Sequence, residues 1–492
     1  MPELNGPVYA SFLILGAANL VPWMTFLSLA DYFAFRYGNN AMEFTFPAIS
    51  TSVLVAVSAL LLAVGSAFSF DVRIVPPTLA MALMMLTVPA IDVLVVSGSL
   101  TTEVAFPLTL LTVFVSALSS AVAQNSLYGL GGLLGEGVMQ ALQAGNGVAG
   151  VLSVALRAAS KLGLPVALSM WVFCGAAALL VVLSVFGYRR VMVDPQIASA
   201  VYAARNYAAQ FAARSPGAPF GTQFVPQFSD SPLSTLPSRR YAHELKRVGR
   251  HASAKNPSAL AQLLEDNGMM SGSMPTQPSP GGTDPMASPV DAFGMSEKLS
   301  SAWLVGRESV SVFVVFLVCL SCFPGLTTSL HSHSWDLGDW FPLLLVATYN
   351  TGDLVGKWLP APRLPLIGRY LPARVRLFGR GMLPVVVLLH LCFIPAFLLM
   401  VSKPPQLASL LKSDAVPLTI VLLLGVSTGY IGCMCLSLAA ERGTTAAQKE
   451  MAGMVSSFAL MVGLSAGSAL GLALSNFIAP NAAPSLPPPP IT

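Results

Sequence analysis

The feature that most constrains this chain is a pair of opposite charges inside an apolar segment. Residues 340–359 form a run about as long as a membrane-spanning helix, yet Asp353 and Lys357 lie within it. On insertion scales, each such charge costs about 2.5–3.5 kcal/mol at the centre of a bilayer. The chain must therefore turn this face of the helix toward protein or water, away from lipid.

The spacing of the two charges predicts how they are accommodated. Asp353 and Lys357 are four residues apart with the acid first, which is the favourable order for an ion pair on one helix face. Asn350 extends the polar stripe by one turn, while Gly352 and Gly356 permit the close approach of a neighbouring helix or a ligand. Either a structural ion pair that joins two helices or a substrate pathway fits this pattern. We take the pathway as the working hypothesis, because charges inside a membrane typically mark one.

The composition of the whole chain is that of a polytopic membrane protein. Charged residues make up 10% of its 492 residues, against about 25% in an average soluble protein, and the mean hydropathy is +0.70. The net charge of +4 does not indicate a nucleic-acid partner. Cys319 and Cys322 have metal-like spacing but no adjacent histidine or carboxylate, so we expect no metal and no cofactor.

Windows of about 19 residues predict eleven membrane spans. Six lie in the first half, at residues 9–30, 46–68, 77–97, 105–128, 138–160 and 165–188. Five lie in the second half, at residues 309–330, 340–360, 382–401, 416–438 and 451–477. We therefore expect an all-α membrane protein in which a six-helix bundle (1–188) and a five-helix bundle (309–480) enclose a central site, as in secondary transporters.

The segment between the halves, residues 189–308, is rich in Pro, Ser, Gln and Gly and has no sustained apolar run. Such a segment cannot bury a core, so we expect a largely disordered linker, and we expect residues 481–492 to form a Pro-rich tail. Basic residues such as Arg73, Arg380 and Arg442 gather in short loops on one side. The positive-inside rule then places the N-terminus and the linker in the cytosol and the C-terminus outside. A monomer in the plasma membrane is expected.

Several motifs follow one another along the predicted spans. They are Gly-Ala-Ala-Asn-Leu-Val-Pro-Trp (16–23), Gln-Asn-Ser-Leu-Tyr-Gly-Leu (124–130), Gln-Ala-Gly-Asn-Gly-Val-Ala-Gly (143–150), Phe-Pro-Gly-Leu-Thr (323–327) and Asn-x-x-Asp-x-x-Gly-Lys (350–357). In this order, on these helices, they resemble the equilibrative nucleoside transporters. The resemblance covers both membrane halves but not the linker. It implies eleven helices in a 6+5 arrangement, a major-facilitator-like fold with alternating access, and a large cytosolic loop after helix six.

The resemblance also implies roles for individual residues. Trp23 matches a tryptophan that lines the family's cavity and could stack on a planar base, with Leu20 and Leu27 as an apolar wall one turn to either side. Gln124 matches a glutamine that hydrogen-bonds the base, and Phe323 would be a second aromatic wall. The alternatives are an interfacial aromatic residue for Trp23, an interhelical hydrogen bond for Gln124 and core packing for Phe323.

Two positions depart from the family pattern. Asp353 matches the aspartate of helix eight, but Lys357 stands where the family usually has arginine, and Met24 replaces the asparagine of a Pro-Trp-Asn motif. In the family, the Asp/Arg pair is associated with the ribose hydroxyls. Arginine offers a planar fork and lysine a point charge, so the exchange is not conservative. This predicts a site that favours free nucleobases over nucleosides.

We therefore expect a carrier of purine nucleobases or nucleosides through the lipid bilayer, with Asn350 also lining the path. A carboxylate in a cavity can take up a proton, so coupling to a proton gradient is a further hypothesis. The alternatives are an ordinary purine nucleoside carrier, a carrier of another small solute on the same general fold, and a channel. An enzyme is disfavoured, because His390 is the one histidine within a predicted span.

Overall fold

The part of the chain that the structure describes is almost entirely helical. The computed structural model describes residues 6–37, 42–64, 68–202, 295–338, 340–360, 379–402 and 413–478. Within these ranges the regular elements are α-helices and one short 3-10 helix, η3 (Arg380–Met382). The all-α prediction is confirmed.

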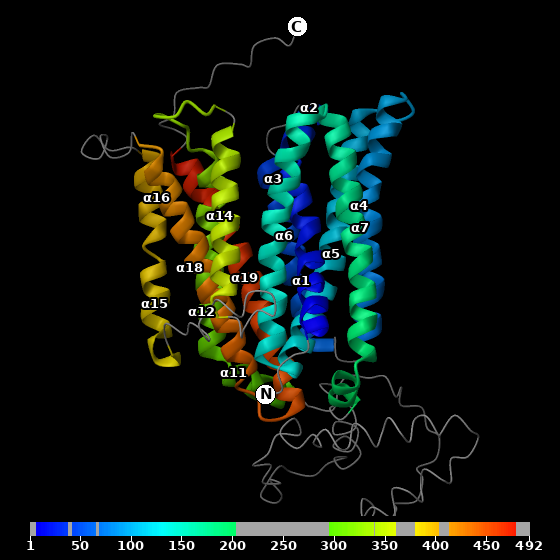
Figure 1. Ribbon diagram of the computed structural model, residues 1–492, viewed down its shortest axis with the longest axis vertical. Helices are drawn as coiled ribbons and strands as arrows, with labels where there is room; N and C mark the ends of the chain where they lie inside the picture. Colours follow the sequence, from blue (N-terminus) through cyan, green and yellow to red (C-terminus); the bar gives the residue numbers. More distant parts are fainter. Residues whose placement is uncertain are drawn as a thin grey trace, which may run out of the picture. The chain divides into compact units, whose positions relative to one another are not determined.

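The N-terminal half forms one bundle of long helices (Figure 1). Its helices are α1 (Gly6–Ser28), the short α2 (Ala30–Tyr37), α3 (Met42–Val64), α4 (Phe70–Val96), α5 (Thr102–Leu134), α6 (Glu136–Gly163) and α7 (Val166–Val193). Residues such as Phe12, Phe33 and Phe173 are fully buried between them. Hydrophobic burial of this kind is the main favourable term that holds the bundle together.

The C-terminal half forms the second bundle. Its helices are α11 (Met295–Leu304), α12 (Gly306–Cys322), the short α13 (Gly325–Thr328), α14 (Trp340–Trp358), α15 (Leu383–His390), α16 (Phe393–Ser402), α18 (Ala415–Ala440) and α19 (Ala446–Ile478). Helix α14 lies against α18, and a Cβ added at Gly356 would collide with the backbone of Val426. Glycine at this position therefore permits the close approach of the two helices.

Each predicted span coincides with a helix or a pair of helices, but the count of eleven spans stays a prediction. Among the described residues, nine segments are long and apolar enough to cross a membrane. The predicted spans at 138–160 and 340–360, which correspond to α6 and α14, are not among these nine segments. Both carry polar residues along one face, which include Gln143, Asn146, Asp353 and Lys357. Their lower hydropathy follows from the surface that they present to the interior of the protein.

Two predicted spans are interrupted at prolines. The segment predicted at 382–401 is divided into α15 and α16, because the ring of Pro395 is incompatible with a continuing helix at the carbonyl of Leu391. Helix α12 ends at Cys322, and Phe323 is extended (φ −124°, ψ 136°). A residue that precedes proline is disfavoured in the helical region, and Pro324 follows Phe323 directly.

The predicted linker and tail fall largely outside the described residues. Of the range 189–308, the structure describes residues 189–202 and 295–308, and these are mostly helical. Helix α7 thus continues past the predicted boundary at residue 188, and α12 begins before the one at residue 309. The tail, residues 481–492, lies outside the described part of the chain.

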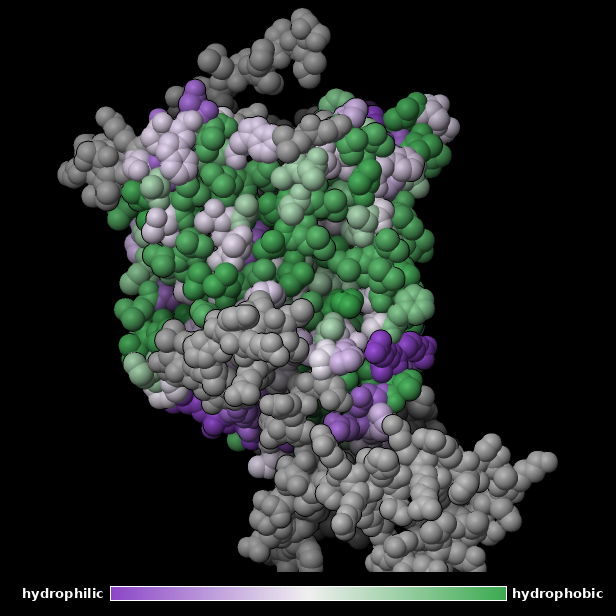
Figure 2. Space-filling model, in the orientation of Figure 1, coloured by the Kyte–Doolittle hydropathy of each residue, from purple (hydrophilic) through white to green (hydrophobic). Residues whose placement is uncertain are grey.

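Hydrophobic side chains cover the middle of the face drawn in Figure 2, and hydrophilic residues gather toward one end. Large apolar residues that are exposed in the bundles include Leu83 on α4, Leu179 on α7 and Leu388 on α15. Soluble monomers rarely expose contiguous apolar surface of this extent. This distribution agrees with helices that face lipid.

The two bundles contact each other mainly through α3, α5 and α6 on one side and α14, α18 and α19 on the other. Helix α6 packs on α14 and α18, and α3 and α5 pack on α19. A Cβ added at Gly150 of α6 would collide with the side-chain oxygen of Asn350 on α14. The backbone of α6 therefore lies directly against the polar stripe that the sequence identified.

An ion pair joins the bundles at one end. Arg73, near the start of α4, places its Nη2 atom 3.1 Å from Oε1 of Glu450, near the start of α19. The two side chains are 2% and 0% exposed, and Arg73 also lies over the ring of Phe70 at 4.6 Å. Because the partners come from opposite bundles, this end can open only if the ion pair breaks.

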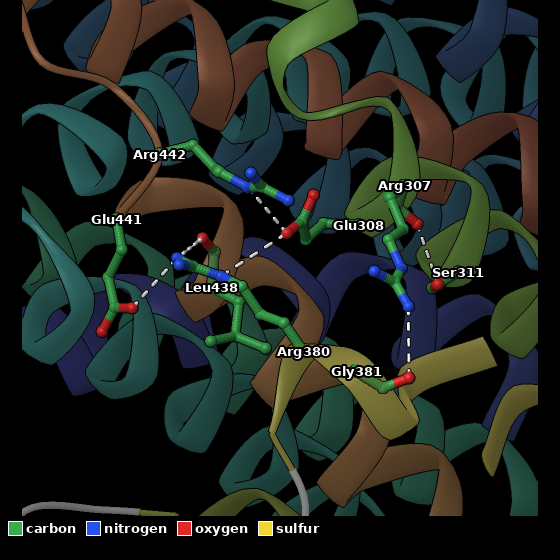
Figure 3. Close-up of polar contacts among 8 residues, drawn as sticks. All are labelled: Arg307, Glu308, Ser311, Arg380, Gly381, Leu438, Glu441 and Arg442. Carbon is green, nitrogen blue, oxygen red and sulfur yellow. Dashed lines mark hydrogen bonds and ion pairs between the residues drawn. The ribbon is translucent and has the colours of Figure 1, made fainter. Parts of the chain in front are cut away.

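A second group of charges holds the loop that precedes Glu450 (Figure 3). The buried Glu308 carboxylate lies 2.9 Å from Nε of Arg442 and 3.6 Å from Nε of Arg380. Arg380 also donates to the carbonyl of Leu438 and to Glu441, at 3.1 and 3.2 Å. These contacts fix the turn between α18 and α19 to the start of α12.

At the other end of α18, Asp414 holds the loop between α13 and α14. Its carboxylate accepts hydrogen bonds from the hydroxyl of Ser332 and from the backbone amides of His333, Ser334 and Trp335, at 2.7–3.2 Å. Burial by itself would raise the pKa of Asp414, but these hydrogen bonds outweigh burial and lower the pKa to about 2. The carboxylate is therefore charged at neutral pH, and this loop is fixed to the helix end.

Candidate binding cavity between the two bundles

A cavity of about 130 Å³ lies where α1, α3, α5 and α6 meet α12, α14 and α19. Sites for small molecules typically have volumes of roughly 300–1,000 Å³. The cavity is smaller than such a site, so a solute with several rings requires it to widen.

All eight residues that the sequence singled out line this one cavity. They are Leu20, Trp23 and Leu27 on α1, Gln124 on α5, Phe323 after α12, and Asn350, Asp353 and Lys357 on α14. They come from four separate stretches of the sequence, and the packing of the two bundles brings them together. Their role in binding a substrate stays a prediction.

The charged pair lies on one face of α14, as its spacing predicted. Nζ of Lys357 is 2.6 Å from Oδ2 of Asp353, and both side chains are buried, 7% and 10% exposed. The neighbouring helix α6 contacts the same turn through Gln140, whose amide donates to the backbone carbonyl of Lys357 at 3.1 Å. The ion pair itself lies within a single helix. The structural alternative required an ion pair that joins two helices, and this pair does not do so.

The residues of α1 and α5 form the opposite wall. Trp23 is partly buried and lines the cavity between Leu20 and Leu27. Gln124 accepts a hydrogen bond from the amide of Asn19 at 2.9 Å, so the interhelical hydrogen bond considered for this glutamine is present. Gln124 nevertheless lines the cavity. Asn19 thus orients the Gln124 amide, which can serve both purposes.

The aromatic wall on the side of the C-terminal bundle consists of two rings. Phe323 stacks on Tyr349 with 3.9 Å between ring centroids and 15° between ring planes, and both residues line the cavity. The hydroxyl of Tyr349 lies 2.8 Å from the sulfur of Cys319. Phe323 thus packs against Tyr349 and also lines the cavity, so core packing and a place in the cavity wall both hold for it.

Sequence reasoning missed several polar residues of the cavity. Asn19, Tyr128, Gln143 and Asn146 line it, although each of them stands in one of the motifs that carry the family resemblance. The signal that could have found Gln143 and Asn146 is the low hydropathy of residues 138–160 compared with the other spans. Amide side chains on one face of a membrane helix imply a polar partner.

Comparison with known proteins points to the same family as the motifs. Residues 302–475 match the family model described as "Nucleoside transporter". Over 468 residues, the chain is 26% identical to equilibrative nucleotide transporter 1 of Arabidopsis thaliana. The alignment covers 94% of this chain and 84% of the relative. The chain is also 25% identical over 476 residues to human equilibrative nucleoside transporter 4, in an alignment that covers 94% of this chain and 82% of the relative. The family model and these relatives together support the equilibrative nucleoside transporter family for this chain.

Both membrane halves of this chain align with these relatives, as the motifs predicted. The match to the family model begins within α11 and ends within α19, so it includes the charged pair of α14. Among solved structures, the human organic anion transporter aligns over 96% of this chain and 94% of its own, with 16% identity and a TM-score of 0.45.

Proposed function

We propose that this protein carries nucleosides across a membrane by alternating access to the cavity between its bundles. The observation that carries the proposal is the buried pair Asp353–Lys357, which lies on one helix and faces the cavity. Charged groups inside a membrane typically mark a substrate pathway. The description of the family model and the names of the relatives called nucleoside transporters supply the substrate class.

The cavity offers a partner for each part of a nucleoside. The ring of Trp23 can stack on a planar base, and the Gln124 amide can hydrogen-bond the edge of the base. The carboxylate of Asp353 can accept hydrogen bonds from ribose hydroxyls, and the ammonium of Lys357 can donate to their oxygens. A charged donor and a charged acceptor side by side suit a diol, which presents both functions.

The preference between nucleosides and free bases follows from the same pair. Lysine in place of arginine predicted a preference for bases. In the structure, Lys357 is held by Asp353 at 2.6 Å, so both groups are ordered to meet hydroxyls. This ordering favours nucleosides as the substrate, and free purine bases remain the alternative.

The transport cycle requires that each end of the cavity open in turn. The pair Arg73–Glu450 crosses between the bundles at the end where α4 and α19 begin. Positive charge in the short loops assigns this end to the cytosol. The described conformation is then one in which the cytosolic end is closed.

Uptake of labelled inosine in cells that lack nucleoside transporters tests the proposal. We expect saturable uptake, with an inhibition constant for inosine at or below that of hypoxanthine, since a site that bonds a hydroxyl discriminates in favour of it. A hypoxanthine constant about tenfold lower would replace the proposal with a nucleobase carrier; about tenfold corresponds to 1.4 kcal/mol.

The same cells test coupling to protons. Asp353 can take up a proton only when its pair with Lys357 opens, so we propose facilitated transport that does not require a proton gradient. The initial rate at fixed outer pH should then be unchanged by a protonophore. A large drop in that rate would establish the proton-coupled alternative. Uptake that does not saturate would indicate a channel.

A further inference from the structure

A tyrosine on the wall of the cavity has its hydroxyl fixed from two sides. Tyr128 of α5 lines the cavity and is 2% exposed. The side-chain amide of Gln143 donates a hydrogen bond to its hydroxyl oxygen, and the amide of Asn146 donates another at 3.1 Å. Both donors come from α6, one turn apart. The phenol is therefore held in one position and orientation.

These two hydrogen bonds determine what the hydroxyl can still do. A phenolic oxygen can accept hydrogen bonds and carries one hydrogen of its own to donate. Because Gln143 and Asn146 both donate to the oxygen, its accepting capacity is occupied. Among the residues that the structure describes, no acceptor receives the hydrogen of the hydroxyl, so it remains for an acceptor on another molecule. Within the cavity, Tyr128 is thus a fixed donor.

The position of Tyr128 indicates which part of a substrate it meets. Tyr128 follows Gln124 by four residues, so the two side chains lie on the same face of α5, and both line the cavity. The charged pair suited to the sugar lies on α14 in the other bundle. A nucleoside that places its sugar at Asp353 can extend its base toward Gln124 and Tyr128.

We propose that Tyr128, positioned by Gln143 and Asn146, donates a hydrogen bond to a ring nitrogen or carbonyl oxygen of the substrate's base and so determines which bases are accepted. The inference rests on the proposed function and adds a specificity-determining residue to it. Gln143 and Asn146 are positioning residues, since they act through the phenol.

The test combines one substitution with substrates that each lack one acceptor. Uptake of inosine is compared with uptake of 3-deazainosine, 7-deazainosine and purine riboside, which lacks the carbonyl oxygen. In the wild type, one analogue should have a KM about three- to tenfold above that of inosine, the range expected for one neutral hydrogen bond, with little change in maximal rate. In Tyr128→Phe, the KM of inosine should rise by that factor, and the penalty of the same analogue should disappear.

A matched control removes a hydroxyl of the same kind from another site. Tyr9 is buried and donates to the amide oxygen of Gln140 at 3.0 Å, and it is not among the residues that line the cavity. Tyr9→Phe should keep the full pattern of analogue penalties. A loss of the pattern in both variants would indicate a general disturbance of the bundle and would overturn the inference.

A second variant covers the case in which Tyr128→Phe does not reach the membrane. In Gln143→Glu, the carboxylate accepts the hydrogen of the phenol, so the hydroxyl no longer donates to the substrate and the analogue penalty should shrink. Unchanged penalties in a transporting Tyr128→Phe or Gln143→Glu variant would contradict the inference while leaving nucleoside transport in place. If the wild type takes up no nucleoside, the proposed function fails and this inference fails with it.

Discussion

Replacing Asp353 with asparagine is expected to leave the protein in the membrane and to lower nucleoside uptake at least tenfold. The substitution removes the charged acceptor from the cavity and leaves the Lys357 ammonium buried without its counter-ion, at 7% exposure. Breaking a buried pair by removing one partner costs about 3–5 kcal/mol, so uptake must be divided by the amount of protein at the cell surface. A variant that transports normally would remove α14 from the pathway.

A double variant separates a binding role from a structural one. In Asp353→Asn/Lys357→Met, the unpaired charge is gone, so the protein should recover the stability that the single variant lost. If the pair serves the substrate, uptake stays low despite this recovery. If the pair is only structural, uptake returns. Thr351→Val is the matched control on the same helix, because Thr351 is exposed and is not among the cavity residues.

The ion pair between the bundles is expected to show strong energetic coupling. Arg73→Gln and Glu450→Gln each remove one partner of this buried ion pair, and each should lower both the thermal midpoint and the maximal rate of uptake. Each substitution should destabilise the conformation in which this end is closed by about 3–5 kcal/mol, because the partners belong to α4 and α19. Arg73→Gln/Glu450→Gln should lose less than the sum of the single variants.

The pair Arg36–Asp92 is the control for this cycle. It joins α2 to α4 inside the N-terminal bundle, with exposures of 17% and 4%. Arg36→Gln should lower the thermal midpoint, but both partners of this pair belong to the N-terminal bundle, so the pair does not oppose the separation of the two bundles. Additive losses in the Arg73 and Glu450 variants would show that this contact does not hold the closed conformation together.

The sequence predicted the helices well because hydropathy and proline act locally. Each predicted span corresponds to a helix or a pair of helices, and the ion pair of Asp353 with Lys357 follows from a spacing of four residues. The interruption at Pro395 is also a local effect. Such features depend on residues within a few turns, which periodicity reads directly.

The contacts between distant segments could not be read in this way. The amide of Asn19 meets Gln124 across 105 residues, and Arg73 meets Glu450 across 377. The fixed phenol of Tyr128 depends on the register of α5 against α6, although its partners are near in sequence. The sequence motifs brought attention to the right helices, but the pairing of individual polar groups depends on how the helices pack.

The central claim is that substrate binds in the cavity between the bundles, and protection of an introduced thiol tests it directly. In purified Leu27→Cys protein, alkylation by a maleimide is followed by mass spectrometry of the labelled peptide with and without saturating inosine. Leu27 lines the cavity, so inosine should slow its alkylation. It should not slow that of Ser99→Cys at an exposed loop, and Asp353→Asn should abolish the protection. Equal rates with and without inosine, in a Leu27→Cys protein that transports inosine, would contradict the claim.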